Sequence, residues 1–117
     1  MLAQNINVDQ TGCLAVATVV TPLLSLGEGQ EIVAELQERI RYSNASLFIL
    51  DLAEVEFMDS GFIGMLVGFL QEVQAVRGRI VLAECQPNVA FLFKVTRLDS
   101  VFTICDTLEE AKDELGG

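Results

Sequence analysis

One six-residue run limits the folds open to this chain more than any other feature. Residues 47–52 read Leu-Phe-Ile-Leu-Asp-Leu and are apolar at every position except Asp51. A strand with one face in water alternates polar and apolar residues, whereas a continuous apolar run is typical of a strand covered on both faces, as in parallel sheets. We therefore expect an α/β fold in which helices cover this strand from both sides.

The rest of the chain alternates between strand and helix patterns. β-Branched or alternating runs predict further strands over residues 5–9, 13–20, 79–83 and 100–105. Apolar residues at helical spacing, preceded by capping residues, predict helices over residues 25–44, 60–77, 87–95 and 107–115. A short turn after the first strand favours an antiparallel hairpin, and the later alternation favours parallel strands. The prediction is one α/β domain over residues 1–117, with a mixed, mostly parallel β-sheet covered by about four helices.

The charge balance and the absence of histidine exclude several classes of function. The chain has 17 acidic and 7 basic residues, and because the basic ones are scattered, nucleic acid is not an expected partner. Without histidine, Ser-His or Cys-His nucleophile pairs and imidazole metal sites are excluded. Cys13, Cys85 and Cys105 are too far apart for a disulfide framework, and we expect buried, reduced side chains. With no signal-peptide pattern and no bilayer-spanning run, we expect a cytoplasmic protein without membrane insertion, metal or cofactor.

Four carboxylates follow the central strand: Asp51, Glu54, Glu56 and Asp59. Sites in α/β folds lie at the carboxyl ends of parallel strands, so this group could bind Mg²⁺ or serve phosphoryl transfer with Asp51 as acceptor. A phosphoacceptor receiver domain also needs an acidic pair after its first strand and a lysine after its last, and both are missing. Glycine motifs for nucleotide binding are missing too. The simpler interpretation is a solvated loop that ends in a helix cap.

The segment 57–64 (Phe-Met-Asp-Ser-Gly-Phe-Ile-Gly) is the most informative about function. One interpretation is that Ser60 only caps the helix that follows. The other uses the same geometry, because a phosphate on Ser60 is tolerated at the positive end of a helix. It would add about −1.5 to −2 charges near Asp59 and Glu56 and could break an interface formed over this turn.

The helix that starts here has more apolar residues than a single buried stripe requires. On a helical wheel they span about 200°, roughly twice the width of one core-facing stripe. Two features lie outside that stripe, namely a flank with Phe62, Met65 and Phe69 and a ridge of Gly61, Gly64 and Gly68. Two interpretations remain open: neighbouring helices cover both features, or the flank is a docking face for a partner.

Several stretches resemble the STAS domain of bacterial anti-sigma factor antagonists. They are residues 50–52 (Leu-Asp-Leu), 55–60 (Val-Glu-Phe-Met-Asp-Ser), 77–83 (Arg-Gly-Arg-Ile-Val-Leu-Ala) and 97–111. The likeness covers nearly the whole chain, and the order of predicted elements agrees. It implies a protein switch that is not an enzyme. In that family the unphosphorylated antagonist binds a serine-kinase anti-sigma factor, the kinase phosphorylates one Ser or Thr at the start of the helix, and a phosphatase resets the cycle.

The chain departs from the family pattern at this turn. The pattern is Asp-Ser-Ser/Thr-Gly-Leu-Gly, with the second hydroxyl residue as phosphoacceptor. Residues 59–60 and 63–64 match it, but Gly61 stands at the acceptor position and Phe62 replaces a glycine. Either Ser60 has taken over as acceptor, or the switch is lost, or Phe62 has changed the choice of partner.

Three hypotheses follow. The first is a phosphorylation-regulated antagonist with Ser60 as phosphoacceptor, whose partners are the kinase and a phosphatase. Its partner-binding candidates are Asp59, Gly61, Phe62, Met65 and Phe69. The second is a non-phosphorylated STAS scaffold, homodimer or subunit in a signalling or transporter-associated complex. The third, and least favoured, is an enzyme with Mg²⁺-dependent phosphoryl chemistry on the loop 51–59.

Overall fold

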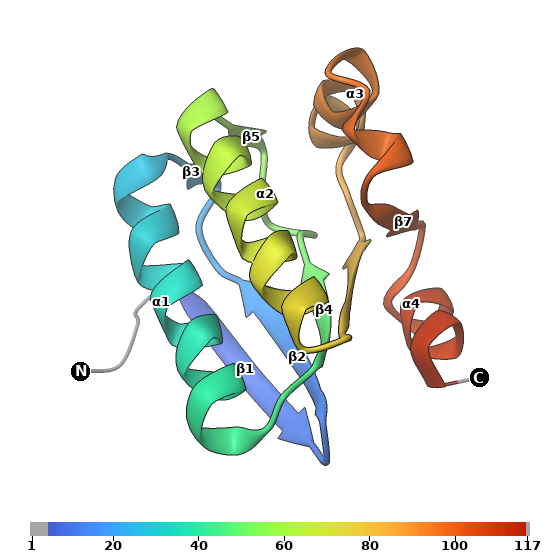
Figure 1. The fold of residues 1–117 in the computed structure, drawn as a ribbon. Coiled ribbons are helices and arrows are strands. Elements are labelled where there is room, and N and C mark those ends of the chain that lie inside the picture. The colour runs from blue at the N-terminus through green and yellow to red at the C-terminus, as the bar shows by residue number, and fades with distance from the viewer. Residues whose placement is uncertain (1–4, 117) are drawn as a thin grey trace.

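The computed structural model describes residues 5–116, which form a five-stranded sheet with helices on both faces (Figure 1). The strands are β1 (Ile6–Thr11), β2 (Leu14–Val19), β4 (Leu47–Asp51), β6 (Arg79–Ala83) and β7 (Thr103–Cys105). They lie in the order β1-β2-β4-β6-β7, with β1 antiparallel to β2 and all other neighbours parallel. The predicted α/β fold with a mixed, mostly parallel sheet is confirmed.

The helices cover the two faces of the sheet unequally. α1 (Leu26–Ser43) and α2 (Ser60–Ala75) lie side by side on one face, and both begin at the carboxyl end of the parallel strands (Figure 1). α4 (Leu108–Gly116) packs on β4, β6 and β7 from the other face. α3 (Pro87–Val95) lies beyond the carboxyl end of the strands (Figure 1). None of the described helices is long and apolar enough to cross a membrane.

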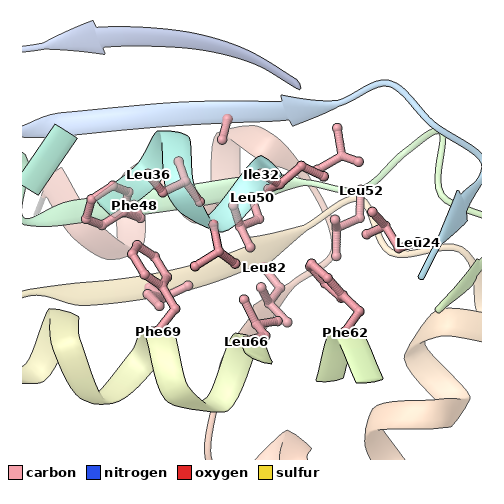
Figure 2. Packing of buried hydrophobic residues seen from close by; sticks show 14 of the residues in the cluster. Leu24, Ile32, Leu36, Phe48, Leu50, Leu52, Phe62, Leu66, Phe69 and Leu82 are labelled. Atoms are coloured by element: carbon pink, nitrogen blue, oxygen red, sulfur yellow. The ribbon is translucent and has the colours of Figure 1, made fainter. Parts of the chain in front are cut away.

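The central strand β4 is buried from both sides, as its apolar run predicts. Phe48, Ile49 and Leu50 are each 0% exposed. Phe48 and Leu50 point into the main core, which lies between the sheet and the helices α1 and α2 (Figure 2). Ile49 points to the opposite face and packs with Ala111 of α4. Because successive side chains of a strand alternate between faces, a continuous apolar run contributes to two cores at once.

Local signals mark the helix ends. α1 begins after Ser25, whose hydroxyl donates to the Glu28 carboxylate, and this hydrogen bond lowers the pKa of Glu28. α1 ends at Asn44, which adopts the left-handed conformation common after helices, with φ 57°. α4 follows Thr107, whose Oγ1 accepts the Glu110 N–H at 3.1 Å. The helix boundaries predicted from these residues agree with the structure to within a few residues.

Three short elements have no counterpart in the prediction. β3 (Leu23–Leu24) and β5 (Phe57–Met58) form a two-residue parallel pair, and η1 (Leu98–Ser100) is a single 3₁₀ turn. Elements of this length are too short to show a periodic pattern in the sequence. The predicted strand over residues 100–105 is shorter than expected, because the 3₁₀ turn precedes it and β7 begins only at Thr103.

The cysteines correct one prediction. Cys13 is exposed in the turn between β1 and β2, and Cys85 and Cys105 are only partly buried. All three are free thiols, as expected, but none is a fully buried core residue. Desolvation raises the pKa of the Cys85 thiol to about 11, which keeps this side chain protonated at neutral pH.

Candidate partner-binding site

The start of α2 is held by the segment that follows β2. The carbonyl oxygen of Pro22 accepts hydrogen bonds from the backbone N–H groups of Glu56 (2.8 Å) and Phe57 (3.1 Å). The carbonyl oxygen of Leu24 accepts the Asp59 N–H at 2.9 Å. These hydrogen bonds connect the same two segments as the β3–β5 strand pair. The first turn of α2 therefore has a defined position at the carboxyl end of the sheet.

Asp59, and not Ser60, is the N-cap of α2. Asp59 has an extended backbone (φ −91°, ψ 170°), and its Oδ1 accepts the Phe62 N–H at 2.9 Å. The prediction that Ser60 caps the helix is wrong by one residue. Asp and Ser have similar N-cap preferences, so residue type alone did not separate them. Ser60 is the first residue of α2 and is exposed, and its hydroxyl is not needed for the cap.

Gly61 lies next to Leu26, the first residue of α1. A Cβ atom built on Gly61 would be 3.2 Å from Leu26 Cβ and 3.3 Å from Asp59 Oδ1. The best separation of two carbon atoms is about 3.5–4.0 Å, so a side chain at position 61 requires a small shift of Leu26. At the position that the STAS resemblance identifies as the phosphoacceptor, this chain therefore has little room for a side chain.

Phe62 points into the core and packs on Gly29 of α1. Figure 2 shows its ring among the core side chains, and the residue is 0% exposed. A Cβ atom on Gly29 would overlap Cδ1 of the Phe62 ring and would lie 3.1 Å from Cε1. The two helices approach closely here because one contributes an aromatic ring and the other has no side chain. Phe62 is a packing residue.

The predicted docking flank of α2 is largely buried, which corrects the prediction for two of its residues. Phe62 is fully buried, and Phe69 is 1% exposed. Phe69 packs edge-on against Phe48, with ring centroids 5.3 Å apart. Met65 is only partly buried. The broad apolar arc of α2 is explained by two neighbours, since the helix packs on both the sheet and α1.

The exposed side of α2 is its glycine ridge, with an apolar patch at its start. Gly64 and Gly68 are exposed, and a Cβ atom on either would meet no other atom within 4 Å. The patch consists of Leu23, Leu26 and Phe57, which are 59, 48 and 55% exposed. Leu23 is the partner of Phe57 in the β3–β5 pair. Exposed apolar side chains that gather in this way mark interaction surfaces.

Sequence reasoning missed Leu23 and Leu26. Both stand beside Leu24, which is 1% exposed, and an apolar cluster before a helix is usually interpreted as core. The β3–β5 pair places Leu23 outward and Leu24 inward, whereas Leu26 is exposed as the first residue of α1. Because β3 is two residues long, its alternation could not be recognised in the sequence.

The four carboxylates after β4 do not form a metal site. One oxygen of Asp51 accepts a backbone N–H of its own loop at 3.1 Å, and Asp59 caps α2. Glu54 and Glu56 are exposed. In the described part of the chain, no three Asp, Glu, Cys or His side chains are placed to hold a metal ion. Asp59 thus provides the helix cap, and the two glutamates form the solvated part of this loop.

Relatives with known names point to one class of protein. The STAS domain model matches residues 5–111 of this chain. The anti-sigma F factor antagonist of Lysinibacillus sphaericus is 28% identical over 88 residues, which cover 75% of this chain and 74% of that protein. A Thermotoga neapolitana protein provisionally named an anti-sigma factor antagonist is 35% identical over 69 residues, or 59% of this chain. The match spans 61% of that relative, less than two thirds of its length.

Solved structures of the same class share the fold. The unphosphorylated anti-sigma factor antagonist SpoIIAA is 25% identical, with a TM-score of 0.77 over 96% of this chain and 98% of that one. An anti-sigma factor antagonist (STAS) domain protein from Planctomyces limnophilus has a TM-score of 0.81 at 24% identity, over 94% and 96% of the two chains. At that lower identity the likeness concerns the fold alone. With a family model that matches nearly its whole length, this chain belongs to the STAS domain family, and it has homologues that are named anti-sigma factor antagonists.

Proposed function

We propose that this chain is a cytoplasmic anti-sigma factor antagonist that works by partner switching. The unphosphorylated form binds a serine-kinase anti-sigma factor through the surface around the start of α2. Phosphorylation of Ser60 by that kinase ends the complex, and a phosphatase restores the binding form. The chain acts by binding and not by catalysis. The homologues named anti-sigma factor antagonists support this class of partner.

One observation carries the proposal: an exposed serine begins α2 beside exposed apolar side chains. Because Asp59 caps the helix, the Ser60 hydroxyl is available to a kinase. Leu23, Leu26 and Phe57 supply the apolar surface that a partner would bury. A few well-buried side chains near the centre of an interface contribute most of its affinity.

A phosphate on Ser60 suits the fold but not an interface over it. The free N–H groups and the dipole of the first turn of α2 favour an anion. In a complex the same phosphate, with about −1.5 to −2 charges, would be buried among apolar side chains and beside the Asp59 carboxylate. Burying a charged group without a partner is costly, so the complex is destabilised while the domain stays folded.

Phosphopeptide mapping and binding measurements test this proposal. After incubation with Mg-ATP, host lysate and a phosphatase inhibitor, we expect phosphate on the peptide 58–77, at Ser60. Ser60→Ala should remove it, whereas Ser100→Ala, at another exposed serine, should not. Ser60→Glu should weaken binding to the anti-sigma factor at least about tenfold, while Ser60→Ala binds like the natural chain. Unchanged affinity of the Ser60→Glu protein would overturn the proposal.

The surroundings of Gly61 favour a second candidate function. The family's acceptor position has no hydroxyl here, and Leu26 leaves little room for one. A STAS scaffold or subunit in a signalling or transporter-associated complex would need no acceptor. This alternative predicts that the peptide 58–77 stays unmodified beside a phosphorylated control antagonist. It also predicts a complex whose stability does not change when ATP is added.

A further inference from the structure

α3 presents an apolar and basic surface to solvent. Phe91 and Val95, one helical turn apart, are 64 and 55% exposed. Lys94 is on the same side of the helix, Arg97 follows the helix end, and both are exposed. These four residues are termed the basic stripe. The segment 85–98 contains no acidic residue, although the chain has a net charge of −10.

Neither cation of the basic stripe forms an ion pair within the described part of the chain. The ion pairs among residues 5–116 join Arg39 to Glu35 and Arg79 to Glu114, at 3.3 and 3.1 Å. Neither pair involves α3. An exposed aromatic ring beside free cations fits a partner surface that is apolar at its centre and acidic at its edge.

A surface of that kind lies on neighbouring elements of the same chain. Leu23 and Phe57, paired across β3 and β5, are both more than half exposed. Glu54 and Glu56 precede Phe57 and are exposed. These four residues are termed the acidic patch. It is apolar at its centre and negative beside it, and so complements the basic stripe in both properties.

The acidic patch and the basic stripe adjoin each other. α3 packs next to β5 (Figure 1). Gln86, the N-cap of α3, donates from Nε2 to the carbonyl oxygen of Ala53 at 2.7 Å, one residue before Glu54. The elements that carry the two surfaces are therefore neighbours at the carboxyl end of the sheet.

We propose that two copies of this chain form a two-fold dimer in which the basic stripe of each lies on the acidic patch of the other. A two-fold axis places the basic stripe of each copy opposite the acidic patch of the other. Because the two surfaces adjoin, both contacts can form at once. The net charge of −10 on each copy opposes association. At physiological ionic strength, however, the Debye length is about 8 Å, so charges at the interface outweigh distant ones.

Sedimentation velocity on the purified full chain tests the dimer. We expect a mass of twice 12.8 kDa at a protein concentration of about 100 μM, falling to that of the single chain on dilution. Lys94→Glu/Arg97→Glu should raise the dissociation constant at least about tenfold, because it places like charges opposite each other. Phe91→Ala should do the same through lost apolar contact. Lys112→Glu, at an exposed lysine on α4, is the matched control and should leave the dimer unchanged.

A mixing experiment tests the pairing itself. Glu54→Lys/Glu56→Lys alone should be monomeric, as should Lys94→Glu/Arg97→Glu alone. In a mixture, each surface of one variant faces an opposite charge on the other, so we expect a heterodimer of the two. Circular dichroism of each variant shows whether it is folded, which separates loss of association from loss of structure.

Three outcomes would overturn the dimer. They are a chain that stays monomeric at all concentrations, a dimer that survives both double substitutions, and assemblies that grow beyond two copies, which would indicate an open head-to-tail contact. If the chain is monomeric, the basic stripe serves another protein. Leu23 and Phe57 also belong to the surface proposed for the anti-sigma factor, so the dimer and that complex exclude each other. None of these substitutions changes Ser60, so phosphopeptide mapping tells a failure of the phosphorylation switch apart from a failure of the dimer.

Discussion

The first turn of α2 has one side that faces the core and one side that faces solvent, and the two sides differ in packing. On the inner side, the ring of Phe62 occupies the space over Gly29 and is fully buried. On the outer side, Ser60 is exposed, and the half-exposed Leu26 leaves little room for a side chain at Gly61. Each side departs once from the STAS pattern. Phe62 replaces a glycine of the pattern and is buried in the core, so this difference affects stability. Gly61 replaces the hydroxyl residue of the pattern and changes the surface that a kinase or partner contacts.

The largest effect should come from truncating the inner side. Phe62→Ala removes a fully buried ring and should lower the free energy of unfolding by about 3–5 kcal/mol, measured by urea denaturation. Phe57→Ala is the matched control, because this ring belongs to the same segment but is 55% exposed. It should change stability by no more than about 0.5 kcal/mol. Equal losses for the two variants would contradict the contrast between the two sides.

A smaller effect is expected from filling the space at Gly29. Gly29→Ala places a methyl group against the Phe62 ring and should cost about 1–3 kcal/mol. Combining it with Phe62→Leu should recover part of this cost, with a coupling energy of about 0.5–3 kcal/mol in a double-mutant cycle. Gly64→Ala is the control, since a methyl group there meets open space and should stabilise α2 by about 0.5–1 kcal/mol. Additive effects of the two core substitutions would mean that ring and glycine do not depend on each other.

The sequence predicted the parts of the fold that repeat over several residues. The run 47–52 indicated a strand covered on both faces, and helical spacing after residues 25 and 60 placed α1 and α2. Burial follows from such patterns because each residue contributes to the same face. The β3–β5 pair was missed, since two residues show no period and their partner lies far along the chain.

The candidate site was only partly predictable for a related reason. Ser60 and Asp59 were found because capping depends on residue type and local spacing. Whether Phe62 and Phe69 face a partner or the core depends on Gly29 of α1 and Phe48 of β4, which meet α2 from earlier parts of the chain. Similarly, only the contact with Leu26 shows that there is little room for a side chain at position 61. Long-range contacts of this kind leave no periodic signal near the residues that they affect.

A substitution at the boundary between the two sides should have an intermediate effect. Asp59→Ala removes the hydrogen bond to the Phe62 N–H and should lower stability by about 1 kcal/mol. Ser60→Ala removes a hydroxyl that makes no cap and should stay within about 0.5 kcal/mol of the natural chain. Both values come from urea denaturation under the same conditions. The reverse order would show that Ser60 caps the helix in solution.

The smallest effect on stability, and the most informative for function, should come from restoring a hydroxyl at position 61. Gly61→Ser brings its Cβ to 3.2 Å from Leu26 Cβ, but Leu26 is 48% exposed and can move outward, so the cost should be below about 1 kcal/mol. Adding Leu26→Ala should remove that cost in urea denaturation.

Phosphopeptide mapping of the same two proteins then identifies the residue that a kinase uses. Phosphate on Ser60 in both, with position 61 unmodified, would mean that the acceptor has moved one residue toward the helix start. If phosphate is found at position 61 only when Leu26 is also shortened, the natural chain is not phosphorylated there for two reasons. It has no hydroxyl at position 61, and Leu26 blocks that position. The outer side of the turn would then have lost its switch, while Phe62 on the inner side still packs in the core.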